Sequence, residues 1–381
     1  MQYSKKTWDD LPVTARLASF KPGRGTAEHH AMISLNDPRL KAAAQYESLA
    51  TAIARLRQSA ALQGCTPVFM RCFVSDVVNQ QQFLSAWEDD AAVSIVQQPP
   101  LNGTKVAAWV YFVENGHVSR ESPATAILHR PACRHLYLTQ MHAPLQDEYA
   151  ETEHIFQTCI ATLRRHGCTL KEHCLRTWIF VQGVDVHYAG MVKARTAVFD
   201  REGLTADTHY IASTGIEGRH PNLQTLVEMD AYAVQGIRPE QIRHLHAPAH
   251  LNPTSEYGVT FERGTAVDYG DRRHVFISGT ASIDNRGEIV HPGDIEKQVD
   301  RTMENVAALL AEAGATTGDI AQMIVYLRDT ADFRLISDYF DRHHPAVPRV
   351  IVLAPVCRPG WLVEVECMAI VATEESRFEI F

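Results

Sequence analysis

Two glutamates lie in an otherwise apolar stretch of the sequence, GWLVEVECMAIV at residues 360–371. The stretch alternates as a β-strand does, so Glu364 and Glu366 must point to the same face. A buried carboxylate is costly unless it is paired, hydrogen-bonded or used in chemistry. Burial and a neighbouring like charge both raise the pKa of a carboxyl group, and a carboxyl with a pKa near neutrality can move a proton. Glu364 is therefore predicted to be a general acid or base.

Arg349 is the second residue whose type and position suggest chemistry. It lies fifteen positions before Glu364, and its guanidinium is a planar fork that matches a carboxylate with two parallel hydrogen bonds. Arg349 is predicted to hold the acid group of a substrate while Glu364 moves the proton. The structural alternative for Arg349 is an ion pair with a nearby glutamate. For both glutamates it is pairing with arginines such as Arg358 or Arg263 where two units meet.

The elements that carry these residues occur three times along the chain. Each copy has an amphipathic helix, a break that contains a glycine, and then a short β-rich run; the copies lie at 45–76, 146–182 and 298–329. The apolar residues of each helix step by three or four, as one buried helix face requires. Self-similarity of this kind indicates one structural unit written three times.

The segments around each helix extend the repeat to a plan of the form β-β-α-β-α-β-β. A strand precedes the helices at 30–35, 135–140 and 274–279. A second helix-like stretch follows near 79–88, 184–202 and 331–343. A closing pair of strands is predicted at 92–97 with 105–114, 209–214 with 224–234, and 348–354 with 361–371.

Unit boundaries are predicted near residues 120 and 240. They give a degenerate first unit at 1–120, a second unit at 121–240, and a third at 241–381 that carries the main site residues. Residues 235–256, which are rich in proline and histidine, are expected to form the longest linker.

The predicted fold class is α+β. Each unit is expected to be a mixed, mostly antiparallel sheet with two helices on one face, which leaves the other face apolar and in need of cover. Three copies in one chain can cover one another around a pseudo-threefold axis. The chain is therefore expected to be a monomer shaped like a trimer, and further association of such pseudo-trimers is left open.

The overall composition is that of a globular protein with a substantial core. The 381 residues are 45% hydrophobic and 21% charged, and the formal net charge of -9 argues against a nucleic-acid partner. No apolar run reaches the roughly 18 residues that a membrane span needs. The eight cysteines lie mostly in apolar segments without a CxxC pair, which is typical of free thiols in a reducing compartment. A cytoplasmic location is expected.

The third unit resembles the Rid superfamily, also called YjgF, whose small members assemble as trimers. The matching stretches are SEYG (255–258), VFISGT (275–280), HPGDIEKQVDRTMENVAALLAEAGATTGDI (291–320), VPRVIVL (347–353) and LVEVE (362–366). The helix with its glycine is a weak signal by itself. An arginine fifteen positions before a Glu-x-Glu strand, preceded by a Ser-Gly strand, is much more specific.

Over the whole chain, the plan of three units is similar to the chorismatase branch of this superfamily. The stretches that carry the resemblance are RTWIFVQGVD (176–185), IASTGI (211–216), EYG (256–258), VHPGD (290–294) and CRPGWLVEVE (357–366). Chorismatases split the enol ether of chorismate and release pyruvate. The chain departs from them in reading VTFERGT after YG and in keeping Arg349, which resembles the carboxylate-binding arginine of the enamine and imine deaminases. The sequence therefore does not decide whether the substrate is that of a chorismatase or that of an enamine or imine deaminase.

The resemblance places active sites in clefts between neighbouring units, so three clefts are possible. Only one is expected to be complete. The counterpart of Glu364 is Glu228 in the second unit but Ala107 in the first, and the counterparts of the arginine are uncharged, at about Ser213 and Ser94.

Further substrate-binding residues are implied by the same resemblance. Tyr257 would line the cleft with its ring and hydroxyl, and Gly279, after Ser278, would let a backbone N–H approach a ligand closely. Glu366 is a further binding candidate. Two pairs from the second unit complete the set: Thr214 with Gly215, and Arg176 with Trp178. Core packing is the alternative for Tyr257, Arg176 and Trp178.

The resulting hypothesis is a hydrolase that acts on a small unsaturated carboxylate without metal or organic cofactor. Chorismate cleavage comes first, and hydrolysis of an enamine or imine acid to a keto acid and ammonia second. A non-catalytic metabolite-binding protein is a third possibility, and a ribonuclease is disfavoured by the acidic charge balance. His244, His246 and His250 lie close together but lack a carboxylate or cysteine to complete a metal shell. No nucleophile motif such as GxSxG is present to suggest covalent catalysis.

Overall fold

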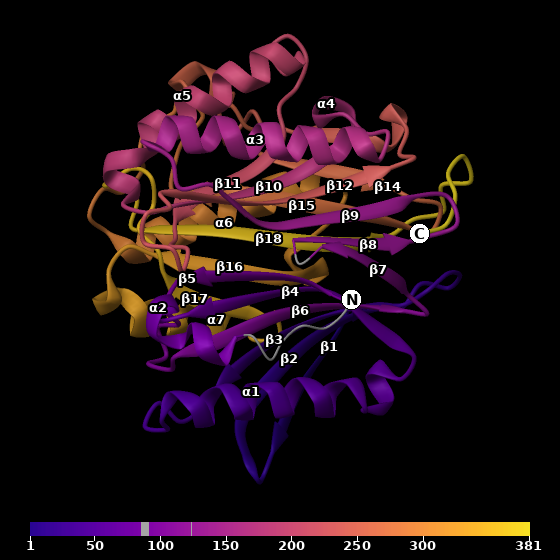
Figure 1. The fold of residues 1–381 in the computed structure, drawn as a ribbon, viewed down its shortest axis with the longest axis vertical. Helices are drawn as coiled ribbons and strands as arrows, with labels where there is room; N and C mark the ends of the chain where they lie inside the picture. Colours follow the sequence, from indigo (N-terminus) through magenta and orange to yellow (C-terminus); the bar gives the residue numbers. More distant parts are fainter. Residues whose placement is uncertain (85–90, 123) are drawn as a thin grey trace.

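Three six-stranded sheets, built one after another along the chain, make up the structure (Figure 1). The computed structural model describes residues 1–84, 91–122 and 124–381. In all three sheets the first three strands lie in order and are followed by the sixth, the fourth and the fifth. The fourth and fifth strands pair in parallel, and the other neighbours pair antiparallel. The prediction of three tandem α+β units is confirmed.

The elements of the three units have the following bounds. The first unit contains β1 (Gln2–Trp8), β2 (Leu11–Phe20), β3 (Glu28–Leu35), α1 (Ala42–Arg57), β4 (Cys65–Val74), α2 (Val77–Gln80), β5 (Ala92–Gln97) and β6 (Val106–Glu114). The second contains β7 (His117–Ser122), β8 (Thr125–His129), β9 (Arg134–His142), α3 (Glu148–Arg165), α4 (Leu170–His173), β10 (Cys174–Val181), α5 (Val184–Glu202), β11 (Ala212–Glu217) and β12 (Val227–Gln235). The third contains β13 (Ile242–Leu245), β14 (Gly264–Asp268), β15 (Arg272–Ala281), α6 (Ile295–Glu312), β16 (Ile320–Leu327), α7 (Phe333–His343), β17 (Arg349–Leu353) and β18 (Val363–Ala372).

Each unit has one more strand than the predicted β-β-α-β-α-β-β plan. The extra strands are the sheet edges β1, β7 and β13, and they lack the buried alternation that reveals a strand in the sequence. The segment 235–256, expected to be a linker, is not wholly irregular, because it contains β13 and most of the short 3-10 helix Thr254–Tyr257. The boundary predicted near residue 120 falls inside β7. Residues 85–88 of the helix-like stretch predicted at 79–88 lie outside the described residues.

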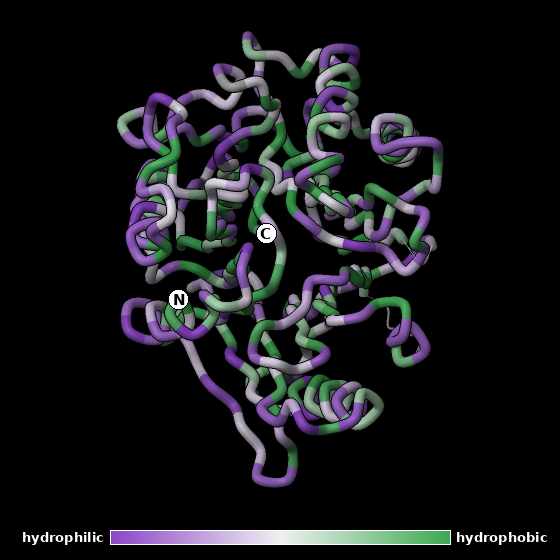
Figure 2. Tube along the Cα trace, turned by 90° about the vertical axis from the view of Figure 1, so that its left-hand side faces the viewer, coloured by the Kyte–Doolittle hydropathy of each residue, from purple (hydrophilic) through white to green (hydrophobic). Residues whose placement is uncertain are grey.

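The longer helices lie on the outside of the sheets. In Figure 1, α3 and α5 cover the sheet of the second unit at the top, and α1 lies under the sheet of the first unit at the bottom. α6 packs on β15 and β18 of the third unit. Figure 2 shows several of these helices nearly end-on at the periphery. Among the described residues, no helix is long and apolar enough to cross a bilayer.

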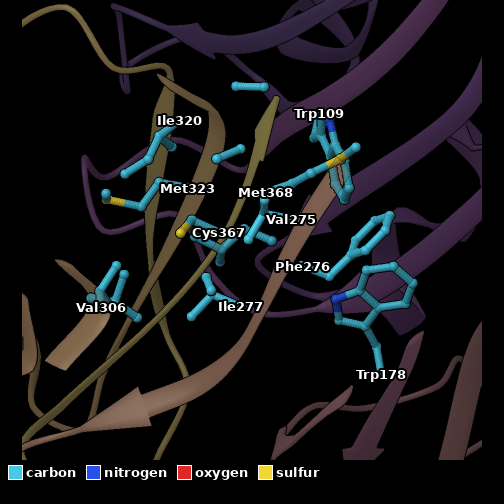
Figure 3. Packing of buried hydrophobic residues seen from close by; sticks show 14 of the residues in the cluster. Trp109, Trp178, Val275, Phe276, Ile277, Val306, Ile320, Met323, Cys367 and Met368 are labelled. Atoms are coloured by element: carbon cyan, nitrogen blue, oxygen red, sulfur yellow. The ribbon is translucent and has the colours of Figure 1, made fainter. Parts of the chain in front are cut away.

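The opposite faces of the three sheets meet in one common core. Trp109 of β6, Trp178 of β10 and Phe276 of β15 lie together there, one from each unit (Figure 3). Met368 of β18 points toward this cluster, whereas Cys367 points to the other side of the strand, where Val306 of α6 lies (Figure 3). The pseudo-trimer expected from the repeat is therefore formed within one chain.

Buried ion pairs join the units at their seams. The side chains concerned are at most 2% exposed, and the pairs are Arg71–Asp230 between the first and second units, Arg176–Glu366 between the second and third, and Arg272–Glu28 between the third and first. The N–O distances are 2.8, 2.8 and 2.6 Å. Removing one partner of such a pair leaves a charge that water cannot reach, which is strongly destabilising.

Replacing Asp230 by alanine tests how strongly these seams depend on their charges. Arg71 would stay buried with Glu366 4.0 Å away as its nearest carboxylate. We expect Asp230→Ala to lower the free energy of unfolding by about 3–5 kcal/mol, measured by urea denaturation. The control is Glu153→Ala, which removes an exposed ion pair with Arg201 and should cost at most about 1 kcal/mol. Equal effects of the two substitutions would contradict a structural role for the seam charges.

Candidate active site

A cavity of about 40 Å³ lies between the second and third units, and we call it the 2–3 cleft. The second unit contributes side chains from α5 and β11. The third contributes β15, β18, the segment before β14 and the turn between β17 and β18. The lining residues are Tyr188, Arg195, Ser213, Thr214, Gly215, Val259, Phe261, Arg263, Gly279, Ala281, Ile283, Cys357, Arg358, Trp361 and Glu364.

The position of Glu364 is set by its strand and by a neighbouring glycine. Glu364 pairs with Ala281 of β15, and the register of β15 against β18 shifts between Ile277 and Thr280. Such bulges re-aim side chains and often lie beside active sites. A Cβ on Gly279 would lie 2.2 Å from Oε1 of Glu364. Only glycine at this position therefore leaves room for the carboxyl group in the cleft.

The surroundings of Glu364 favour its protonated form. Burial raises its pKa to about 8, and the negative charge of Glu366 on the same strand face adds to the rise. Arg176 and Arg263 oppose it. At neutral pH the carboxyl is mostly neutral, so it can donate a proton to a bound molecule.

Hydrogen bonds between the two units hold the cleft walls in place. The hydroxyl of Thr214 accepts from the backbone N–H of Gly279 at 2.9 Å and from Nη2 of Arg176 at 2.6 Å. The hydroxyl of Ser278 accepts from the N–H of Ser213 at 2.9 Å and donates to the carbonyl of Glu262 at 2.6 Å. Thr214 and Gly279 therefore line the cleft at their predicted positions. Ser278 lies behind the cleft wall and does not line the cavity.

Three arginines that the sequence analysis did not assign to substrate binding line the cleft. Arg195 of α5 is 1% exposed, and its Nε donates to Thr260 at 3.1 Å. Arg263 donates to the backbone carbonyl of Asn252 through Nε and Nη2. The guanidinium of Arg358 lies 4.9 Å from the ring centroid of Trp361. These groups line the cleft with positive charge, and a guanidinium is suited to bind a carboxylate through two parallel hydrogen bonds.

A signal for Arg195 was present in the sequence. It shares a helix face with Met191, Val192 and Val198, all of them buried in α5. An arginine in the apolar stripe of a helix indicates a buried charge, as a glutamate in an apolar strand does. A charge on a buried face needs a partner or a function.

Three predicted binding residues form the seam and do not line the cleft. The carboxylate of Glu366 accepts from Nη2 of Arg176 and from Nε1 of Trp178, both at 2.8 Å. These contacts satisfy the carboxylate inside the protein, which is the structural alternative for this glutamate. The side chain of Tyr257 lies outside the described part of the chain.

The predicted pairing of Arg349 with Glu364 in one cleft is wrong. Arg349 lines a different cavity, between the third and first units, together with Lys5 and Arg16. In the ring, the edge strand β17 of the third unit faces the first unit, whereas Glu364 faces β11 of the second. Every cleft of a trimer of identical units would contain both residue types. A tandem chain with one copy of each can place them in different clefts.

The remaining positions singled out in the sequence do not line the 2–3 cleft. Glu228 is fully buried, and within the described residues neither of its carboxyl oxygens has a hydrogen-bond partner. His244 lies in β13 and stacks on His209 with ring centroids 4.3 Å apart. In the part of the chain that the structure describes, no group of three or more His, Cys, Asp or Glu side chains could hold a metal ion.

Comparisons with known proteins agree with this architecture. The family described as Endoribonuclease L-PSP matches residues 264–371. A RutC family protein of Pyrococcus abyssi is 40% identical over 128 residues, which cover 32% of this chain and 90% of that protein. The 3-aminoacrylate deaminase RutC of Acinetobacter baylyi is 31% identical over 99 residues, or 25% of this chain and 77% of the relative. The chain therefore belongs to the Rid superfamily.

A solved structure resembles the chain over most of its length. The crystal structure of a chorismatase superposes with a TM-score of 0.62 at 19% sequence identity, covering 80% of this chain and 93% of that one. The two proteins share the fold.

The raised pKa of Glu364 predicts how stability depends on pH. The folded protein keeps the proton up to pH about 8, whereas the unfolded chain loses it near 4.5. The contribution of the Glu364 carboxyl to the free energy of unfolding is therefore fully present below pH 4.5 and is lost as the pH rises toward 8. Glu364→Gln lacks this titration. As the pH rises through this range, we therefore expect the free energy of unfolding of the variant to increase relative to that of the wild type, by up to about 1.4 kcal/mol per pH unit.

The measurement is urea denaturation of wild type and Glu364→Gln at pH 5, 6.5 and 8. Glu47→Gln, on the exposed side of α1, is the matched control for replacing a glutamate by glutamine. A difference between wild type and Glu364→Gln that stays constant with pH would show that the carboxyl is ionised in the folded protein.

Proposed function

We propose that this member of the Rid superfamily is a hydrolase that cleaves the enol ether of a small cyclic dicarboxylate such as chorismate and releases pyruvate. The observation that supports the proposal is a buried carboxyl, Glu364, with a pKa of about 8 in a cleft lined by three guanidinium groups. A proton donor and several carboxylate-binding groups are what such a reaction needs.

Glu364 begins the reaction by giving its proton to the terminal methylene carbon of the enol ether. The neighbouring carbon becomes an oxocarbenium ion, and water adds to it while losing a proton to the carboxylate of Glu364. The hemiketal then breaks its bond to the ring oxygen, which takes up the hydroxyl proton. One water is consumed, and pyruvate and the ring alcohol leave while Glu364 is again protonated.

The arginines supply the binding energy and the orientation. A guanidinium binds a carboxylate through two parallel hydrogen bonds. Arg195, Arg263 and Arg358 approach the cleft from α5, from the segment before β14 and from the β17–β18 turn. Two carboxylates held between three fixed cations would bring the enol ether of the substrate to Glu364 in one orientation.

The deaminase reaction remains the second candidate, because RutC relatives include a 3-aminoacrylate deaminase. In that reaction Arg349 would hold the acid group. Arg349 lies in the cavity between the third and first units, where the counterpart of Glu364 is the buried Ala107. The separation of the arginine from the acid favours enol-ether cleavage in the 2–3 cleft.

Incubation with chorismate tests the proposal directly. We expect purified protein to release pyruvate, followed with lactate dehydrogenase and NADH. Glu364→Gln should lower kcat by about 10²–10⁴-fold, the usual contribution of a positioned acid or base. The rate of the wild type should fall as the pH rises through about 8, because the proton on Glu364 is lost.

Two other outcomes decide between the alternatives. Ammonia release from an imino acid, without pyruvate release from chorismate, would support the deaminase. Binding of chorismate by the wild type and Glu364→Gln alike, without turnover in either, would support a non-catalytic binding protein.

Gly279→Ala tests whether the position of the Glu364 carboxyl matters for the reaction. The added Cβ would lie 2.2 Å from Oε1 of Glu364, so the carboxyl must move. We expect turnover of chorismate to fall by at least tenfold while the circular dichroism spectrum is unchanged. Gly23→Ala is the control, since a Cβ there would meet nothing within 4 Å. Full activity of Gly279→Ala would contradict the assigned geometry.

A further inference from the structure

The 2–3 cleft has less room than its proposed substrate needs. Its volume of about 40 Å³ corresponds to roughly three water molecules, and a cyclic dicarboxylate is several times larger. None of the residues that line the cleft is exposed. Part of the cleft wall must therefore move before a substrate can reach Glu364.

A larger cavity of about 370 Å³, which we call the vestibule, lies beside the 2–3 cleft. Its walls are residues 205–210 of the second unit and residues 246–255 and 261–263 of the third. Several of its lining residues are exposed, which opens it to solvent: Ala206, Thr208, His246, Pro248, Pro253 and Ser255. Phe261 and Arg263 line both cavities, so these two side chains separate the vestibule from the cleft.

Arg263 is a fixed part of this partition. Its Nε and Nη2 donate to the backbone carbonyl of Asn252 at 3.3 and 3.0 Å, and Nη2 also donates to Oδ1 of Asn252 at 3.1 Å. Arg263 and Asn252 are both buried. Moving the guanidinium would break these hydrogen bonds away from water, which is costly.

Phe261 has a fixed backbone but a side chain that can turn. Its carbonyl accepts from the hydroxyl of Thr254 at 2.6 Å. The next residue, Glu262, donates its backbone N–H to the carbonyl of Ile211 at 3.0 Å and accepts from the N–H of Tyr210 at 2.7 Å. The ring of Phe261 is half-buried and has no polar atom to anchor it. Rotation of this ring is the smallest change that joins the two cavities.

The half-buried wall formed by Tyr188, Cys357 and Arg358 is held more firmly. The hydroxyl of Tyr188 and the thiol of Cys357 form a hydrogen bond that joins α5 of the second unit to the β17–β18 turn of the third. The guanidinium of Arg358 lies 4.9 Å from the ring centroid of Trp361. An opening on this side would separate contacts that cross the seam.

We propose that the vestibule is the entrance to the 2–3 cleft and that Phe261 is its gate, whose ring must turn aside before a substrate can reach Glu364. The width of the passage beside Phe261 then limits which substrates enter. This inference rests on the proposed function in taking the 2–3 cleft as the active site, but not on the identity of the substrate.

Alkylation of Cys357 by iodoacetamide, followed by peptide mass spectrometry, tests the entrance without any substrate, because Cys357 lines the cleft. Ala206→Trp and Ser255→Trp fill the vestibule from its two walls. Each should slow alkylation of Cys357 about tenfold relative to Cys65 of β4, whereas Phe261→Ala should accelerate it. Ala43→Trp, on the exposed side of α1, is the matched control and should change nothing. An unchanged rate in both vestibule variants overturns the entrance.

Stopped-flow tryptophan fluorescence with chorismate, in the Glu364→Gln background, gives the second readout. An entrance lies on the path in both directions, so Ala206→Trp should lower the association and dissociation rate constants together, by about tenfold, and leave Kd unchanged. A changed Kd with normal alkylation of Cys357 would make the vestibule part of the binding site and overturn the gate. Slower alkylation in a protein that does not bind chorismate would support the entrance and contradict the proposed substrate.

Discussion

The structure depends on one constraint: each unit has a sheet face that its own helices do not cover. Those faces meet in the middle of the molecule, where Trp109, Trp178 and Phe276 come from three different sheets. Apolar area drives the ring to close, and the charges brought to the seams must then be paired across them. Since the outer face of each sheet is filled by helices, the seams between units are where concave sites can form.

The two glutamates of β18 show how strongly position within a seam decides chemistry. They are two residues apart and point to the same side, yet Glu366 lies between Arg176 and Trp178 of the neighbouring unit, whereas Glu364 faces a cavity. The two roles are linked, because the charge of Glu366 contributes to the raised pKa of Glu364. Within the ion pair that holds the units together, Glu366 therefore also helps to keep the neighbouring carboxyl neutral, whereas Arg176 opposes this effect.

Tandem duplication gives this fold a freedom that a trimer of identical chains lacks. Identical copies repeat every cleft three times, so a substitution in one appears in all. In this chain the 2–3 cleft has Glu364, Gly279 and three arginines. The cavity between the third and first units has Arg349, and Ala107 of the first unit stands at the position that corresponds to Glu364. The clefts have diverged in charge, volume and acid content, while the strand order of the sheets around them has stayed the same.

The sequence alone determined the three-unit plan, the main helices and strands, and Glu364 with the glycine and threonine positions near it. The repeat, its helices and strands and Glu364 follow from periodicity and local composition, which each segment carries by itself, whereas the glycine and threonine positions were implied by the family resemblance. Only the tertiary structure revealed the edge strands, whose exposed residues show no buried alternation, and the arginines that complete the 2–3 cleft. It also separated Arg349 from Glu364, because ring closure decides which edge of a unit faces which neighbour, and no local pattern records that choice.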